Sequence, residues 1–275
     1  MKTIIIATDF SPAAENAAHY GADMAAALGA QIHLLYVYNI ATSYYEVPLA
    51  WNLTDMTREG EDKIALLKEQ LNNRLNGAVK ITSEVRIGFF LTELKTVCEL
   101  LEPHIVVMGS QGSTSAARLL FGSHAVNASK NLSWPLVTVP PDARYASVQR
   151  IGLASDFEKT EDIPVDEIKM LVDEFNARLL VLHTGRRERF DHDTSPNGVA
   201  HELLGGLNPE FHFIEAPDID DAIIHFADEH EVDMLMVLAK REGFIDKLLH
   251  RNHTKQLVLR SHVPVMALHQ ETEQL

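Results

Sequence analysis

Residues 105–125 read Ile-Val-Val-Met-Gly-Ser-Gln-Gly-Ser-Thr-Ser-Ala-Ala-Arg-Leu-Leu-Phe-Gly-Ser-His-Ala. The stretch opens with a short apolar run after Pro103, which predicts a buried strand. A glycine-rich connection follows, and residues 125–131 predict a helix. Unpaired backbone N–H groups at a helix start can bind a phosphate, and glycines let the backbone approach it closely. Taken alone, the same pattern also fits a surface loop with a helix cap.

Composition excludes several classes of protein. The 275 residues are 46% hydrophobic and 23% charged, which is typical of a soluble globular chain long enough for two domains. No stretch approaches the roughly 20 apolar residues of a membrane span, and the strand-like run from Lys2 to Asp9 does not fit a signal peptide. A single cysteine, Cys98, excludes an intrachain disulfide, so we expect a protein of the reducing cytoplasm.

The acidic charge is spread unevenly. The net charge of −15 argues against non-specific binding to nucleic acid or to an anionic membrane. Residues 1–145 carry 11 basic and 14 acidic side chains, and residues 146–275 carry 13 and 25, so the halves differ at −3 and −12. An anionic ligand therefore prefers the first half on charge alone.

Strand and helix patterns alternate along the first half. This alternation predicts an α/β fold with a doubly wound parallel sheet, in which ligands bind at the carboxyl ends of the strands. Asp9, Val37 and Gly109 lie at or near such ends. The expected strands are residues 3–8, 31–38, 79–87, 105–108 and 136–139, and the expected helices are 13–28, 54–75, 91–101 and 125–131.

The pattern then repeats after a linker at residues 140–144. Residues 150–157 echo residues 2–10, including an Asp-Phe pair, and residues 233–238 echo the strand before Gly109. The chain is therefore an internal duplication, with expected domains at residues 1–141 and 147–275. The second copy has diverged, because Ala239 stands where the first has Gly109, and Arg251-Asn252 replaces Gly122-Ser123.

A spaced glycine motif carries a family resemblance. Gly109, Gly112, Gly122 and Ser123 are separated by two, nine and no residues, and Ala-Thr-Asp-Phe-Ser follows the first strand at residues 7–11. The chain resembles a tandem member of the universal stress protein family. The resemblance implies two Rossmann-like five-stranded domains of the adenine nucleotide alpha hydrolase type, related by a pseudo-two-fold axis. It also implies that their last strands, residues 136–139 and 264–268, pair within the chain as an intrachain pseudo-dimer.

The resemblance further implies a stress-response protein that binds ATP, AMP or ADP in its first domain, with Mg²⁺ possible beside ATP. The acidic residue after the first strand would contact the nucleotide, the second strand would present backbone to adenine, and the motif would hold ribose and phosphates. Gln111 departs from the His or Arg of many members, and a protonated His124 would restore a charge there. The implied site residues are Ala7, Asp9, Val37, Met108, Gly109, Gln111, Gly112, Gly122, Ser123, His124 and Ala125.

Several residues keep a second interpretation. Asp9 could cap the helix that starts at Pro12, and Arg118 could be a solvated helix arginine instead of a phosphate ligand. The aromatic residues of the loop at 39–53 could cover adenine or anchor an interface. The histidines and acids at 183, 191–193 and 201 match no standard zinc spacing, so we expect no metal site there.

No catalytic signature stands out, so we expect a nucleotide-binding regulator, with slow ATP hydrolysis or autophosphorylation left open. The second domain would then be a degenerate dimerisation or regulatory copy, and a homodimer of the whole chain is possible. A nucleotide-independent module that binds a protein, a small ligand or a metal is the alternative from another class. Among these functions, the spaced glycine motif is the feature of the sequence that favours nucleotide binding.

Overall fold

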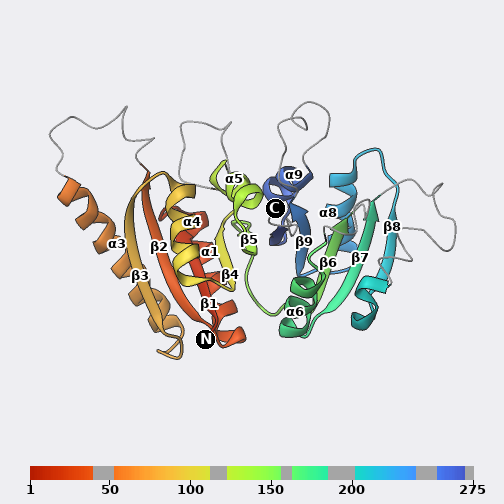
Figure 1. The fold of residues 1–275 in the computed structure, drawn as a ribbon, viewed down its shortest axis with the longest axis horizontal. Helices are drawn as coiled ribbons and strands as arrows, with labels where there is room; N and C mark the ends of the chain where they lie inside the picture. Colours follow the sequence, from red (N-terminus) through yellow and green to blue (C-terminus); the bar gives the residue numbers. More distant parts are fainter. Residues whose placement is uncertain (40–52, 112–122, 156–162, 185–201, 240–252, 270–275) are drawn as a thin grey trace, which may run out of the picture. The chain divides into compact units, whose positions relative to one another are not determined.

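A computed structural model of the chain describes residues 1–39, 53–111, 123–155, 163–184, 202–239 and 253–269 (Figure 1). The chain divides into two compact units. Unit 1 comprises Met1–Ala128 with Trp134–Ala146, and unit 2 comprises Ser129–Ser133 with Ser147–Leu275. In Figure 1 the colours of unit 1 run from red to yellow-green, and those of unit 2 from green to blue.

Unit 1 is a five-stranded sheet in the order β3-β2-β1-β4-β5, and its neighbouring strands are parallel. Strand β1 therefore lies at the centre of the sheet. The chain adds β2 and β3 on one side of β1 and then β4 and β5 on the other, so the switch point of this doubly wound fold lies between β1 and β4. The elements are β1 (Thr3–Thr8), α1 (Pro12–Leu28), β2 (Gln31–Asn39), α3 (Leu53–Arg74), β3 (Ile81–Gly88), α4 (Phe90–Leu101), β4 (Ile105–Gly109), α5 (Ser123–Asn131) and β5 (Leu136–Val139).

The local sequence explains the central elements. All six residues of β1 are buried, as expected of a β-branched run covered on both faces. The Ser11 hydroxyl accepts a hydrogen bond from the Ala14 N–H (3.2 Å) and caps α1, which ends at Gly29 with φ +61°. At Gly21 an added Cβ would lie 3.0 Å from Ile6 Cδ1, so glycine lets α1 pack closely on the sheet.

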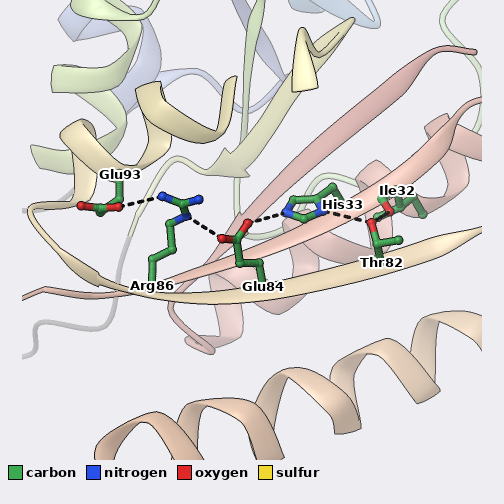
Figure 2. Close-up of polar contacts among 6 residues, drawn as sticks. All are labelled: Ile32, His33, Thr82, Glu84, Arg86 and Glu93. Carbon is green, nitrogen blue, oxygen red and sulfur yellow. Dashed lines mark hydrogen bonds and ion pairs between the residues drawn. The ribbon is translucent and has the colours of Figure 1, made fainter. Parts of the chain in front are cut away.

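The two faces of the unit 1 sheet are covered by different helices. On α3, a Cβ at Gly60 would lie 2.9 Å from the Tyr36 ring and 3.2 Å from Val85 Cγ1, so these two side chains face α3. Side chains alternate along a strand, so Glu84 and Arg86 point to the opposite face. Figure 2 shows them on the side where Glu93 of α4 lies.

Unit 2 repeats this arrangement, with strand order β8-β7-β6-β9-β10 and parallel neighbours. The prediction of two doubly wound α/β sheets is confirmed. The elements are β6 (Arg150–Ser155), α6 (Val165–Phe175), β7 (Arg178–Thr184), the 3-10 helix η3 (Gly205–Leu207), β8 (Glu210–Ile214), α8 (Ile219–Glu229), β9 (Met234–Ala239), α9 (His253–Arg260) and β10 (Val265–His269).

Element boundaries differ from the predicted ones by up to two residues. Helix α5 begins at Ser123, two residues before the expected start, so Ser123 and His124 belong to its first turn. Strand β3 begins at Ile81 instead of residue 79 and runs to Gly88. Strand β2 extends one residue further than predicted, to Asn39. Hydrophobic periodicity locates elements well and their ends less well, because the ends depend on caps and on neighbouring strands.

Two observations bear on the environment of the chain. Among the described residues no helix is long and apolar enough to cross a membrane. Cys98 is buried, and burial raises the pKa of its thiol to about 12, so the reactive thiolate is strongly disfavoured. Cys98 is therefore a packing residue. The cytoplasmic location stays a prediction.

Candidate functional site

The candidate site lies at the carboxyl ends of β2, β1 and β4. Strand β1 pairs with β2 as far as Thr8 and Tyr36, and with β4 as far as Ile6 and Val107. Asp9, Val37 and Gly109 follow these pairs by one or two residues. Because parallel strands end at the same edge of a sheet, the fold brings the three predicted residues to one edge, at the switch point.

The backbone of β2 has an open edge there. Its ladder with β1 ends at Tyr36, whereas its ladder with β3 continues through Val37 and Arg86 to Asn39 and Gly88. The β1-facing backbone of β2 beyond Tyr36 therefore lies outside the β1–β2 ladder. Backbone N–H and C=O groups in this position can form hydrogen bonds with the edge of a flat ligand.

Asp9 begins the turn from β1 into α1. Its Oδ1 accepts a hydrogen bond from the Ser11 N–H at 3.0 Å, while the Ser11 hydroxyl provides the actual cap of α1. Asp9 therefore stabilises the turn before α1 but is not its cap, so the alternative interpretation of Asp9 as the helix cap is wrong. The carboxylate of Asp9 is solvent-exposed. The next residue, Phe10, adopts a left-handed φ of +60°, and its ring lies 4.7 Å from that of Tyr36. One carboxylate oxygen of Asp9 thus orders the turn that leads into α1.

Gly109 ends β4 against the start of α1. A Cβ at this position would lie 3.1 Å from both the carbonyl carbon and the carbonyl oxygen of Ala13, and 3.1 Å from the Gln111 carbonyl oxygen. The neighbours are backbone atoms, which cannot move aside as a flexible side chain can. The next residue, Ser110, is buried and donates its N–H to the Val139 carbonyl (2.9 Å). Packing against α1 alone therefore favours glycine at position 109.

The first turn of α5 reaches the same edge. Ser123 and His124 are exposed, and Ala125 is buried. The His124 ring lies 4.8 Å from the ring of Phe90, the first residue of α4. Nearby protein atoms disfavour the imidazolium and lower the pKa of His124, while the negative charge of Asp9 opposes that shift. His124 therefore lies within electrostatic reach of Asp9, although 115 residues separate them in the sequence.

The remaining predicted residues contribute backbone or lie outside the described ranges. Ala7, Val37 and Met108 are buried, so their side chains belong to the core and only their backbone is near the edge. Gln111 is half-buried just after β4. Gly112, Gly122, Arg118 and the aromatic loop at 40–52 lie outside the described residues, as do residues 191–193 and 201 of the considered metal cluster.

The described residues contain no group of three or more His, Cys, Asp or Glu side chains that could hold a metal ion. His183 of the considered cluster is buried near the end of β7, and its ring lies 5.8 Å from that of Phe213. The prediction that no metal site lies at residues 183–201 thus stays a prediction for the part of the cluster outside the described residues.

Sequence reasoning missed Phe10 and Phe90 at this edge. A signal for Phe90 was present, because Gly-Phe-Phe at residues 88–90 follows a predicted strand and so puts aromatic side chains at another carboxyl end. The signal for Phe10 was weaker, since a left-handed phenylalanine has no pattern of its own. Both aromatic residues become candidates only when the strand order is known.

These features define a doubly wound α/β protein whose predicted site residues lie at the switch point of the sheet. The model of the universal stress protein family matches residues 1–140 and 199–269, which is more than half of the chain. The chain belongs to the universal stress protein family, and the resemblance inferred from the glycine motif is confirmed.

Similar proteins support the same conclusion. The chain is 28% identical over 142 residues to universal stress protein MJ0531 of Methanocaldococcus jannaschii. The matched region covers 50% of this chain and 81% of that protein. The solved structure of a universal stress protein from Archaeoglobus fulgidus matches with a TM-score of 0.74 at 18% identity, and covers 97% of this chain and 98% of its own. A protein of unknown function, PA1789 from Pseudomonas aeruginosa, matches with a TM-score of 0.61 at 9% identity, and covers 98% and 93%. At these identities the solved structures show the fold alone.

Proposed function

We propose that unit 1 binds ATP or another adenine nucleotide at the carboxyl ends of β2, β1 and β4. The observation that carries the proposal is the convergence of Asp9, Gly109 and the first turn of α5 on one edge of the sheet. These groups come from three separate parts of the sequence. Each suits one part of a nucleotide, since a carboxylate accepts hydrogen bonds from hydroxyl or amino groups and helix-start N–H groups donate to phosphate.

The open edge of β2 supports an adenine position next to Val37. Adenine presents both a donor and an acceptor along one edge, and a strand backbone outside its ladder offers the complementary pair. Glycine at position 109 keeps the adjacent β4 end free of a side chain where the ribose and phosphates would pass. The order of these contacts along the edge follows the family resemblance: base at β2, sugar near β1 and β4, phosphates at the loop before α5.

Unit 2 would be a copy without this site. Strand β9 ends in Ala239, whose methyl group is buried at the position where β4 has a glycine. The proposal is therefore one nucleotide per chain, with unit 2 acting as a dimerisation or regulatory copy. The pairing of β5 with β10, an intrachain pseudo-dimer, and a possible homodimer of the chain are parts of the same proposal.

Calorimetric titration with ATP tests the proposal directly. We expect one site per chain, and we expect Asp9→Asn to bind ATP about tenfold more weakly, because a neutral amide replaces a charged acceptor while it keeps the bond to the Ser11 N–H. Asp62→Asn, which removes the same charge from an exposed position on α3, is the matched control and should bind as the wild type does. Undetectable binding at millimolar ATP would contradict the proposal.

A second measurement asks what the protein carries. Mass spectrometry of the supernatant from denatured, freshly purified protein should detect an adenine nucleotide at up to one per chain. Magnesium dependence of the titration would show whether a metal accompanies ATP. Nucleotide that co-purifies equally with the wild type and Asp9→Asn would not come from this site.

A further inference from the structure

Phe90 and His124 form an aromatic pair between the first turns of α4 and α5. Their rings lie 4.8 Å apart with an interplanar angle of 58°, a tilted contact of the kind that aromatic side chains prefer. Phe90 is half-buried, whereas the preceding residue, Phe89, is 61% exposed. The Phe90 ring is thus the one that turns toward the molecule.

A polar network holds the first turn of α4 in place (Figure 2). Arg86 Nη1 donates to Glu93 Oε2 of α4 at 3.2 Å, and Arg86 Nε donates to Glu84 Oε1 at 2.7 Å. Glu84 Oε2 lies 3.4 Å from His33 Nε2 on β2, and His33 Nδ1 lies 3.0 Å from the Thr82 hydroxyl. Strands β2 and β3 are thereby tied to α4, so the position of Phe90 is set by several charged contacts.

The connection from β3 into α4 is a single residue, because β3 ends at Gly88 and α4 begins at Phe90. A Cβ at Gly88 would lie 2.5 Å from Glu93 Oε1, so the glutamate occupies the space that a side chain at Gly88 would take. Gly88 pairs with Asn39 at the carboxyl end of β2. Phe90 therefore follows by two residues the end of β3 that pairs with the carboxyl end of β2.

His124 joins this pair to the candidate site. Helix α5 follows β4 in the chain, and Asp9 follows β1, the neighbour of β4 in the sheet, so the first turn of α5 and Asp9 both come after neighbouring strand ends. The negative charge of Asp9 also acts on the His124 imidazole, which agrees with this placement. Desolvation by nearby protein atoms nonetheless dominates and lowers the pKa of His124 below the usual value of 6.5, although part of the side chain is exposed, and this favours the neutral ring at pH 7. A neutral imidazole in tilted contact with a phenyl ring adds aromatic surface to the site without adding charge. It is a poor source of positive charge for phosphate.

We propose that Phe90, supported by His124, is the wall of the site in unit 1 against which the purine ring of the nucleotide packs. The inference rests on the proposed nucleotide function and adds a specificity-determining residue from α4, an element that the glycine motif does not include. The class of ligand it selects is a nucleotide with an aromatic base. Polyphosphates without a base would gain nothing from this wall.

The test compares two ligands on one variant. Phe90→Leu keeps an apolar side chain but removes the aromatic face, so affinity for ATP should fall about three- to tenfold. Affinity for inorganic tripolyphosphate should stay within about twofold of the wild type, because that ligand has no ring to stack. Phe213→Leu is the matched control, since it removes a Phe–His ring contact in unit 2 and should leave both affinities unchanged.

A second variant reports on the contact itself. Phe90→Trp keeps an aromatic ring, so it should retain ATP binding, and its fluorescence should be quenched by ATP and not by tripolyphosphate. Equal ATP affinity of Phe90→Leu and wild type, both folded by circular dichroism, would overturn the inference and leave the proposed function standing. No ATP binding by the wild type would overturn the proposed function, and this inference with it. Tripolyphosphate affinity that falls in parallel with ATP affinity would also overturn the wall, because Phe90 would then act on the phosphates or the fold.

Discussion

Substitution of Gly109 by alanine tests the packing of β4 against α1. The added Cβ would lie 3.1 Å from the carbonyl carbon and oxygen of Ala13 and from the Gln111 carbonyl oxygen, each a few tenths of an ångström inside normal contact. Relief requires movement of the first turn of α1 or of the chain after β4, because the atoms involved are backbone. Overpacking of this kind costs about 1–3 kcal/mol of unfolding free energy.

A smaller effect on the unfolded chain opposes this loss of stability. Alanine restricts the unfolded chain more than glycine does, which stabilises a protein by about 0.4–1 kcal/mol where the native site accepts the methyl group. The net expectation for Gly109→Ala is a loss of about 1–2 kcal/mol, because the steric cost exceeds the entropic gain. With a urea dependence of about 1–3 kcal/mol per molar, the unfolding midpoint should fall by about 0.3–2 M.

Urea unfolding monitored by tryptophan fluorescence measures this effect in the first unit. Both tryptophans, Trp51 and Trp134, belong to the first half of the sequence, so their emission reports on that half. Gly206→Ala is the control, because a Cβ there would meet no atom within 4 Å. Its unfolding is followed by circular dichroism. That variant should be neutral or slightly more stable. An unchanged or higher midpoint for Gly109→Ala would refute the close approach of β4 to α1.

Three further predictions follow from the described contacts. Burial lowers the pKa of His33 below 6.5, against the opposing charge of Glu84, so the unfolded state takes up this proton more readily. The contribution of His33 to the free energy of unfolding should therefore be fully present above pH 6.5 and be lost as the pH falls through the lowered pKa. In chemical unfolding between pH 8 and 5, the stability of His33→Gln should decline less than that of the wild type. Parallel declines would contradict this origin. Ser11→Ala should cost about 1 kcal/mol in thermal or urea unfolding, because the Ala14 N–H loses its cap, and an unchanged midpoint would mean that the cap contributes nothing. Asn16 donates to the carbonyl oxygens of Pro140 (3.0 Å) and Ala143 (2.9 Å), so Asn16→Ala should release the linker and speed tryptic cleavage after Arg144, whereas an equal cleavage rate would show that these bonds do not restrain it.

Much of the fold was accessible from the sequence because its signals are local. The buried run of β1, the Ser11 cap and the left-handed Gly29 each follow from residue type over a few positions, and all three are present. The duplication was readable for the same reason, since two similar halves repeat the same local signals in the same order. The register between strands was not accessible, because it depends on contacts between residues far apart in the chain.

The candidate site shows the same division. The sequence pointed to Asp9 and Gly109 through their places after strands, and the fold brings both to one edge. It suggested a protonated His124 as a source of charge, whereas desolvation by nearby protein atoms lowers the pKa of His124 and favours the neutral ring. Desolvation depends on which helices meet, and no pattern within residues 122–125 specifies that Phe90 of α4 contacts His124 of α5.

The sequence by itself determined the family, the doubly wound α/β class and the duplication, because glycine spacing and hydrophobic periodicity are properties of short segments. Only the tertiary structure decided that the β2–β3 ladder continues past the β1–β2 ladder, that Gly109 is confined by the backbone of α1, and that Phe90 of α4 contacts His124 of α5. These features arise from packing between residues that are 28 to 96 positions apart in the chain, where local preferences carry no information.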